Sequence, residues 1–125
     1  MGDFAKTATD ANFEAEVLGS DKPLEGAPYD VIFVRLVLMH NPDAKATIRK
    51  LRDYLTPNGR LYLVDVDDRD FCFNPTLPWQ ADLMQLLEQV HQQTNSSRQI
   101  GRELHHYLSD AGFTDVKTEK VVYAT

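Results

Sequence analysis

Hydrophobic positions along the chain change their period several times, and each period predicts a different element. Residues 13–18 (FEAEVL) alternate apolar and acidic side chains, which is the two-residue period of a half-exposed strand. Residues 30–39 (DVIFVRLVLM) are nearly all apolar, which is typical of a strand covered on both faces. Residues 60–66 (RLYLVDV) carry the same β-forming side chains and predict a further strand.

A helix is predicted between the strands at 30–39 and 60–66. Asn41 offers an N-cap, and Pro42 follows at the first helical position. Three apolar residues then recur at helical spacing: Ile48, Leu51 and Leu55. The Pro-Asn-Gly sequence at 57–59 is expected to stop the helix. Because such crossovers join parallel strands and are right-handed, residues 30–66 predict a βαβ unit.

Two further helices and a last strand complete the predicted order. One apolar helix face is formed by Leu83, Leu86, Leu87 and Val90, and another by Ile100, Leu104, Leu108 and Ala111. Ser96 or Ser97 is the expected N-cap of the second helix, and Gly112 its left-handed C-terminal residue. Residues 113–123 predict a final strand. With no repeat or linker visible, we expect one α/β domain over residues 1–125.

Composition and charge narrow the range of partners. The chain of 125 residues is 42% hydrophobic and 26% charged, a balance typical of a globular domain. A formal net charge of -6 disfavours nucleic-acid binding, which needs clustered Lys and Arg. The sequence shows no signal peptide or apolar run long enough to span a membrane, so no membrane partner is expected. One cysteine, Cys72, excludes an intrachain disulfide and fits a reducing, cytoplasmic compartment.

The stretch from Tyr29 to Asp67 is similar to the second half of class I S-adenosylmethionine-dependent methyltransferases. In that family an aromatic-Asp pair opens the fourth strand, and a Leu-x-Pro-x-Gly turn, here at 55–59, leads into the fifth strand. Gly19-Ser20-Asp21 resembles the Gly-Asp pair after the third strand, and Ala111-Gly112-Phe113 resembles the junction of the late helix and the following strand. The resemblance implies a Rossmann-like, mostly parallel sheet flanked by helices.

The sequence departs from the family in one respect that bears on activity. It contains no glycine-rich strand-to-helix turn, which in such folds lets the backbone approach the cofactor. The acidic residue that would hold the ribose has no counterpart either. We therefore expect a partial fold, the C-terminal portion of the domain. A non-catalytic remnant or interaction module is the alternative, and a nicotinamide-dependent enzyme is a further one, although it too needs a glycine-rich turn.

Candidate site residues are those that end strands, because ligands of open α/β sheets sit beyond the carboxyl ends. By resemblance, Asp21 would accept the adenine amino group of S-adenosylmethionine, and Arg35 and Leu36 would lie near its methionine end. Asp21 could also be a turn residue, and Arg35 a solvated charge. His40 could act as a general base, although a histidine before an Asn-Pro cap also has structural uses.

Two groups after the strand at 60–66 have open interpretations. Hard divalent metals prefer several carboxylates, which are present here: Asp65, Asp67, Asp68 and Asp70. The preceding strand ends in Arg35 instead of a partner carboxylate, so no metal is expected and a solvated acidic loop is favoured. The aromatic residues Phe71, Phe73 and Trp79 could shape a substrate pocket or plug the core, and packing is favoured.

The resemblance implies transfer of a methyl group to a nucleophilic N, O or C atom of an unidentified acceptor, chiefly by proximity and in-line orientation. The strand at 30–39 is too apolar to leave a bare edge in water. Either the strand at 13–18 moves beside it, or a second copy or a missing N-terminal half supplies the neighbour. A homodimer is the favoured expectation.

Overall fold

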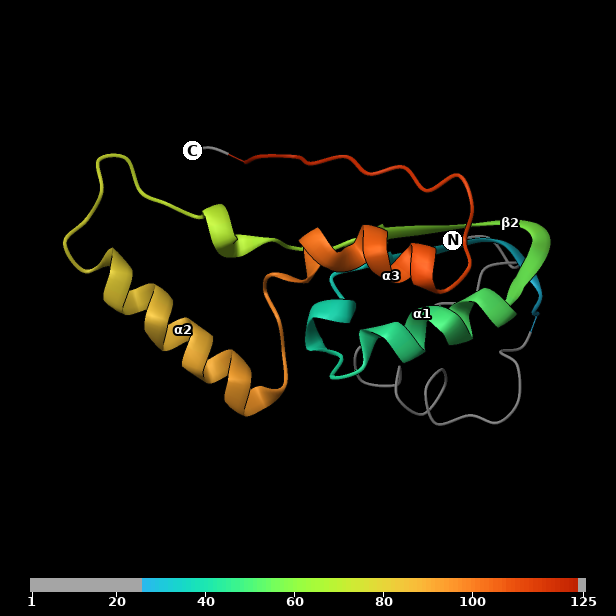
Figure 1. Cartoon of the computed structure of the whole chain (residues 1–125), viewed down its shortest axis with the longest axis horizontal. Coiled ribbons are helices and arrows are strands. Elements are labelled where there is room, and N and C mark those ends of the chain that lie inside the picture. The colour runs from blue at the N-terminus through green and yellow to red at the C-terminus, as the bar shows by residue number, and fades with distance from the viewer. Residues whose placement is uncertain (1–25, 124–125) are drawn as a thin grey trace.

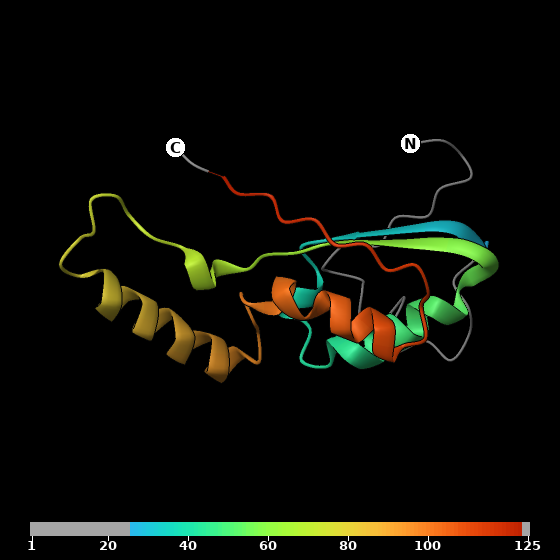
Figure 2. The same cartoon turned by 45° about the horizontal axis from the view of Figure 1, so that its top comes forward.

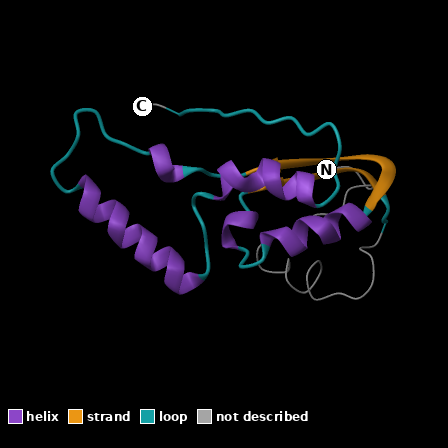
Figure 3. Ribbon diagram, viewed as in Figure 1, coloured by secondary structure: helices purple, strands orange, loops and turns teal. Residues whose placement is uncertain are grey.

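The structure, a computed structural model, describes residues 26–123. The strand predicted at 13–18 and the candidate cofactor residue Asp21 lie outside the described residues. Within them, two parallel strands and their flanking helices confirm the predicted α/β class, and the arrangement is that of a partial Rossmann-like fold (Figures 1 and 3).

Strand β1 (Tyr29–Arg35) pairs in parallel with β2 (Leu55–Val64), as the βαβ prediction requires. The pairing runs from Val31 opposite Arg60 to Arg35 opposite Val64. Tyr29 pairs with Leu55, so an advance of two residues along β1, from Tyr29 to Val31, corresponds to an advance of five residues along β2, from Leu55 to Arg60. The Leu-Thr-Pro-Asn-Gly sequence at 55–59 is therefore a bulge in β2, not only the turn before it.

β1 ends earlier than predicted. The chain leaves the strand at Leu36, and residues 38–40 form a short 3₁₀ helix, η2 (Leu38–His40). The expectation of a single strand to Met39 was therefore wrong. Leu38 and Met39 are nevertheless buried, because the 3₁₀ turn folds them into the core. A continuous apolar run cannot distinguish a strand from a buried helical turn by periodicity alone.

Helix α1 (Ala44–Asp53) crosses between the two strands, and it begins two residues later than predicted. Asp43 is the N-cap, since its carboxylate accepts a hydrogen bond of 3.0 Å from the Ala46 amide. The Asn41 side chain instead accepts from the Asp43 amide at 2.9 Å, so Asn41 organises the turn before the cap. The prediction of Asn41 as N-cap was wrong by two residues.

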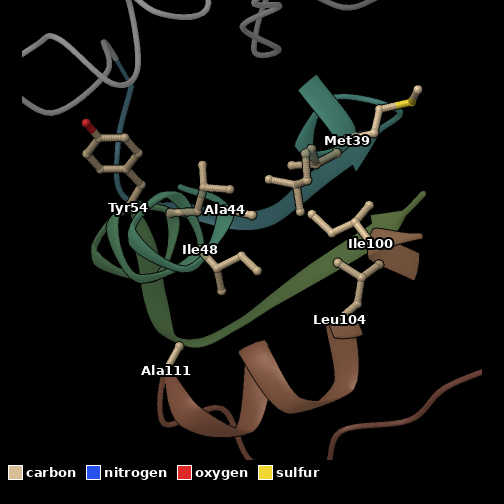
Figure 4. Close-up of a cluster of buried hydrophobic side chains, with 10 residues drawn as sticks. Met39, Ala44, Ile48, Tyr54, Ile100, Leu104 and Ala111 are labelled. Atoms are coloured by element: carbon tan, nitrogen blue, oxygen red, sulfur yellow. The ribbon is translucent and has the colours of Figure 1, made fainter. Parts of the chain in front are cut away.

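The core lies between the sheet and the two helices that share one of its sides (Figures 2 and 4). α1 supplies Ile48 and Leu51, which are 0% and 3% exposed. The second helical segment is η4 (Ile100–Glu103), a 3₁₀ turn that continues into α3 (Leu104–Asp110). It supplies Ile100, Leu104 and Ala111, as its periodicity predicted. Gly112 has φ +87°, the left-handed conformation expected there.

The opposite face of the sheet is exposed. Successive residues alternate between faces, so Ile32 and Val34 point to the helices whereas Val31 and Phe33 point away. Four apolar side chains on this second face are roughly half exposed or more: Val31, Phe33, Tyr62 and Val64. The expectation that β1 is covered on both faces was therefore wrong.

Helix α2 (Gln80–Thr94) lies apart from the sheet, at the end of a long excursion from β2 (Figures 1 and 2). None of its residues is buried, and Leu86 is 56% exposed. The periodicity correctly predicted the helix. It did not predict that the apolar face would remain outside the core.

Residues 113–123 form no strand, so that prediction was wrong. Figure 1 shows the segment running back past α3 without helix or arrow. Side chains hold it instead of ladder bonds: Thr118 bonds His105 at 3.0 Å, and Lys120 pairs with Asp70 at 2.8 Å. Within the described residues no neighbouring strand edge receives it, and β propensity without a partner does not make a strand.

We expect Leu51→Ala to lower the free energy of unfolding by about 2–5 kcal/mol, because it opens a cavity where α1 meets the sheet. Leu86→Ala is the matched control and should change stability by less than about 0.5 kcal/mol. Chemical denaturation measures both. Equal effects of the two substitutions would show that α1 does not carry the core.

Candidate functional site

The carboxyl ends of β1 and β2 meet at one edge of the sheet and form the candidate site. The Leu36 amide donates to the Val64 carbonyl at 2.8 Å, which joins the two strand ends. Leu36 has φ +55°, a left-handed conformation that is uncommon for a side chain of its kind. Arg35, directly before it, is exposed. Backbone strain of this sort clusters at ligand-binding turns, so it marks this edge as a candidate.

Asp65 ties β2 to the turn that follows β1. Its carboxylate accepts hydrogen bonds from the Met39 amide at 3.1 Å and from the Val66 amide at 2.9 Å. Burial raises the pKa of Asp65 above its usual value, and the backbone donors and nearby His40 oppose that rise. Asp65 therefore acts as an anchor for η2.

His40 is the last residue of η2 and is exposed. Its amide donates to the Val37 carbonyl at 3.1 Å, which closes the 3₁₀ turn. His40 lies near Asp65, and it follows the end of β1 at Arg35. Its two predicted roles, general base and structural residue, both stay predictions.

Residues 97–101 dock on the same edge through their backbone. The Ser97 amide donates to the Met39 carbonyl, and the Gly101 amide donates to the Val66 carbonyl, each at 2.7 Å. A Cβ at Gly101 would lie 2.7 Å from the Val66 oxygen, closer than real Cβ atoms come. Only glycine permits this approach. The predicted caps at Ser96 and Ser97 were wrong, since the helical segment begins after Gln99.

The acidic loop after β2 is ion-paired. Asp67 pairs with Arg102 at 2.9 Å, and Asp68 forms an ion pair with Arg98. Lys120 lies 2.8 Å from Asp70 and lowers its pKa. The described residues contain no group of three or more His, Cys, Asp or Glu side chains placed to hold a metal. The loop is therefore held by basic residues from later in the chain, and Asp70 is at the same time exposed to solvent, as the favoured prediction expected.

The aromatic residues after the acidic loop contact one another outside the core. The Phe71 and Phe73 rings are 5.3 Å apart between centroids, and Phe73 and Trp79 are 5.5 Å apart. Phe71 and Trp79 are about half exposed, so the favoured reading that they plug the core was wrong. Phe71 instead lines a cavity of about 360 Å³ beneath α2. This volume falls at the low end of small-molecule sites.

Comparison with known proteins identifies the class. A family model described as a methyltransferase domain matches residues 3–118, which is nearly the whole chain. The chain belongs to this family of methyltransferase domains. The match confirms the resemblance that the sequence analysis based on residues 29–67.

One relative is named methyltransferase str2 and comes from Strobilurus tenacellus. It is 42% identical over 45 residues, which are 36% of this chain and 16% of the relative. The matching segment thus spans about one sixth of that protein. Separately, no helix in residues 26–123 has both the length and the apolar character needed to cross a membrane.

We expect Asp65 to make stability fall as the pH rises. A raised pKa means that the folded protein holds the proton more tightly than the unfolded chain does. The stabilising contribution is therefore full below about pH 3.9, the ordinary value for Asp, and is lost as the pH rises through the raised pKa. Denaturation of the wild type and of Asp65→Asn across this range should show the wild type losing relative stability toward neutral pH.

Asp110→Asn, at the exposed end of α3, is the control for a general change of charge. A constant difference between wild type and Asp65→Asn at every pH would contradict the raised pKa.

Proposed function

We propose that this chain contributes to a S-adenosylmethionine-dependent methyltransferase that transfers a methyl group to a small-molecule acceptor. The observation that carries the proposal is the family match over residues 3–118, together with the strand-end edge at Arg35–Leu36 and Asp65. Ligands of parallel α/β sheets bind at this edge. The single cysteine of the sequence supports the further proposal of a reducing, cytoplasmic location.

The described residues fit one end of the cofactor. Arg35 is exposed at the tip of β1, where a guanidinium could bind the carboxylate of the methionine portion. Leu36, with φ +55°, turns the backbone away from the strand at this edge. Other charges nearby are engaged: Asp65 accepts from two amides, and Asp67 pairs with Arg102. Asp21, proposed for the adenine end, lies outside the described residues.

The bound cofactor would supply an activated methyl group on a sulfonium sulfur. The task of this chain is then to hold and orient the reactants, since methyl transfer depends on in-line geometry. Asp65 and the docked residues 97–101 fix the backbone around the edge, so they act as positioning elements. His40 is proposed as a candidate base, because its imidazole stands at the exposed end of η2.

We expect the 125-residue chain to bind S-adenosylmethionine weakly, with a dissociation constant above about 100 μM, because one end of the cofactor is held and the glycine-rich turn is lacking. In a heteronuclear NMR titration the amide shifts should centre on residues 35–36 and 65–67. Arg35→Ala should reduce them, whereas Arg49→Ala, an exposed arginine on α1, should not. Low-micromolar affinity would refute the weak-binding proposal, and shifts confined to other residues would refute the site.

A second candidate function is an interaction module that pairs with another chain. It is favoured by the exposed apolar face of the sheet, on which Phe33 is 61% exposed and Val31 is 58% exposed. Apolar patches of this kind mark protein interfaces. A second copy of the chain or an N-terminal half of a methyltransferase domain would cover it.

Self-association is tested by sedimentation at micromolar concentration, where we expect a dimer. Phe33→Lys places a charge on the exposed sheet face and should shift the population toward monomer. Leu86→Lys is the matched control on exposed α2 and should leave the dimer intact. A wild-type chain that stays monomeric would exclude this interface.

A further inference from the structure

The cavity beneath α2 is built from one helix face and two loop segments. Met84 lies three and four residues before Leu87 and Glu88, and His91 lies four and three residues after them, so the four residues share one side of α2. Phe71 and Asp68 approach from the segment after β2, and Arg98 and Gln99 from the segment before η4. Leu86 and Val90 do not line the cavity and face elsewhere.

One wall of the cavity is apolar and adaptable. Phe71 offers a ring that is about half exposed, and its edge contact with Phe73 fixes its position. Met84 and Leu87 stand across from it on α2. The thioether of methionine packs well against aromatic rings and adjusts to irregular shapes. This wall suits a flat, apolar body.

The charged residues of the lining balance one another. Asp68 and Arg98, which both line the cavity, form an ion pair. Arg69 donates to the Gln99 side chain at 3.2 Å, and Gln99 in turn donates to Glu88 at 3.5 Å. Two acidic and two basic side chains therefore line the cavity, each within this network. Acidic and basic side chains are equal in number in the lining, so an uncharged ligand is favoured.

Two polar residues of the lining, Gln80 and His91, lie outside this network, and the Gln80 side chain already accepts a hydrogen bond from the Phe73 amide at 3.1 Å. The His91 backbone carbonyl accepts from the Ser96 amide at 3.0 Å, but the His91 imidazole makes no hydrogen bond to another residue in the described part of the chain. The side chain is half-buried on the cavity side of α2. A neutral imidazole has one donor and one acceptor, and either can meet a hydroxyl group.

We propose that this cavity binds the methyl acceptor, and that the acceptor is a small uncharged aromatic molecule bearing a hydroxyl group. The rings lie against Phe71, Met84 and Leu87, and the hydroxyl group meets His91. That the bound molecule is the methyl acceptor rests on the proposed methyltransferase function, whereas binding of this chemical class rests on the cavity alone. A volume of about 360 Å³ accommodates one or two rings.

The probe is 2-naphthol, which has two fused rings and one hydroxyl group, titrated into the 125-residue chain without S-adenosylmethionine. Binding followed by heteronuclear NMR should give a dissociation constant on the order of 0.1–1 mM, as suits a ligand of this size. Amide shifts should centre on residues 68–71, 84–91 and 98–99. The anion 2-naphthoate, with the same rings, should bind more weakly.

Leu87→Glu should weaken 2-naphthol binding by about tenfold or more, because it places a charge in the apolar wall. The matched control is Leu86→Glu, the same change on the adjacent residue outside the lining, which should alter binding by less than about twofold. His91→Ala should weaken 2-naphthol and leave 2-naphthoate unchanged. Far-UV circular dichroism checks that α2 persists in each variant.

Equal weakening by Leu86→Glu and Leu87→Glu, tighter binding of 2-naphthoate, or no saturable shift at these residues would each overturn the proposal. The experiment is independent of the cofactor. Naphthol binding in a chain that shows no S-adenosylmethionine shifts at residues 35–36 and 65–67 would therefore count against the proposed cofactor site and in favour of the cavity, and the reverse result would count against the cavity alone.

Discussion

Parallel pairing of β1 with β2 is the constraint on which the remaining structure depends. Two parallel strands cannot be joined by a tight turn, so the chain between them must cross one face of the sheet. α1 makes that crossing and buries Ile48 and Leu51 against the strands. The same pairing brings both carboxyl ends to one edge. The pairing of β1 with β2 therefore determines both the core, which lies on one face of the sheet, and the candidate site, which lies at the carboxyl ends of the strands.

Strand pairing alone would leave the edge loosely defined, and backbone hydrogen bonds from distant segments complete it. The Asp65 carboxylate holds the Met39 amide, and the Met39 carbonyl holds the Ser97 amide. Three segments remote in sequence thus meet around Met39. Ion pairs of Asp68 with Arg98, and of Asp67 with Arg102 directly after residues 97–101, reinforce the contact. Partly buried pairs of this kind are screened less by salt than exposed ones.

The sequence was informative where burial produces a period and less so elsewhere. α1 and the segment at 100–111 were predictable because each buries a stripe at helical spacing. The bulge at 55–59 was not, since a Pro-Asn-Gly sequence fits a turn and a bulge equally well. The strand predicted at 113–123 failed because strand formation depends on a neighbour.

At the site, Arg35 and Leu36 could be located from strand ends, but the left-handed turn at Leu36 could not, because leucine gives no signal of it. The pairing of Asp68 with Arg98 was equally hidden, since sequence does not reveal which distant charges meet. The cavity beneath α2 was also hidden, since its apolar lining on the helix is Met84 and Leu87, and only Leu87 belongs to the apolar face that the sequence predicts.

The missing side chain at Gly101 has a mechanical consequence for the cavity. The Gly101 backbone lies directly against Val66, and the neighbouring residue Ile100 is buried in the core. Arg98 and Gln99 immediately precede this contact, so the cavity wall that they form is attached directly to the core. The wall on α2 has no such attachment, because none of the residues of α2 is buried. The two walls of the cavity therefore differ in support, because one adjoins the buried residue Ile100 and the other lies on a helix outside the core.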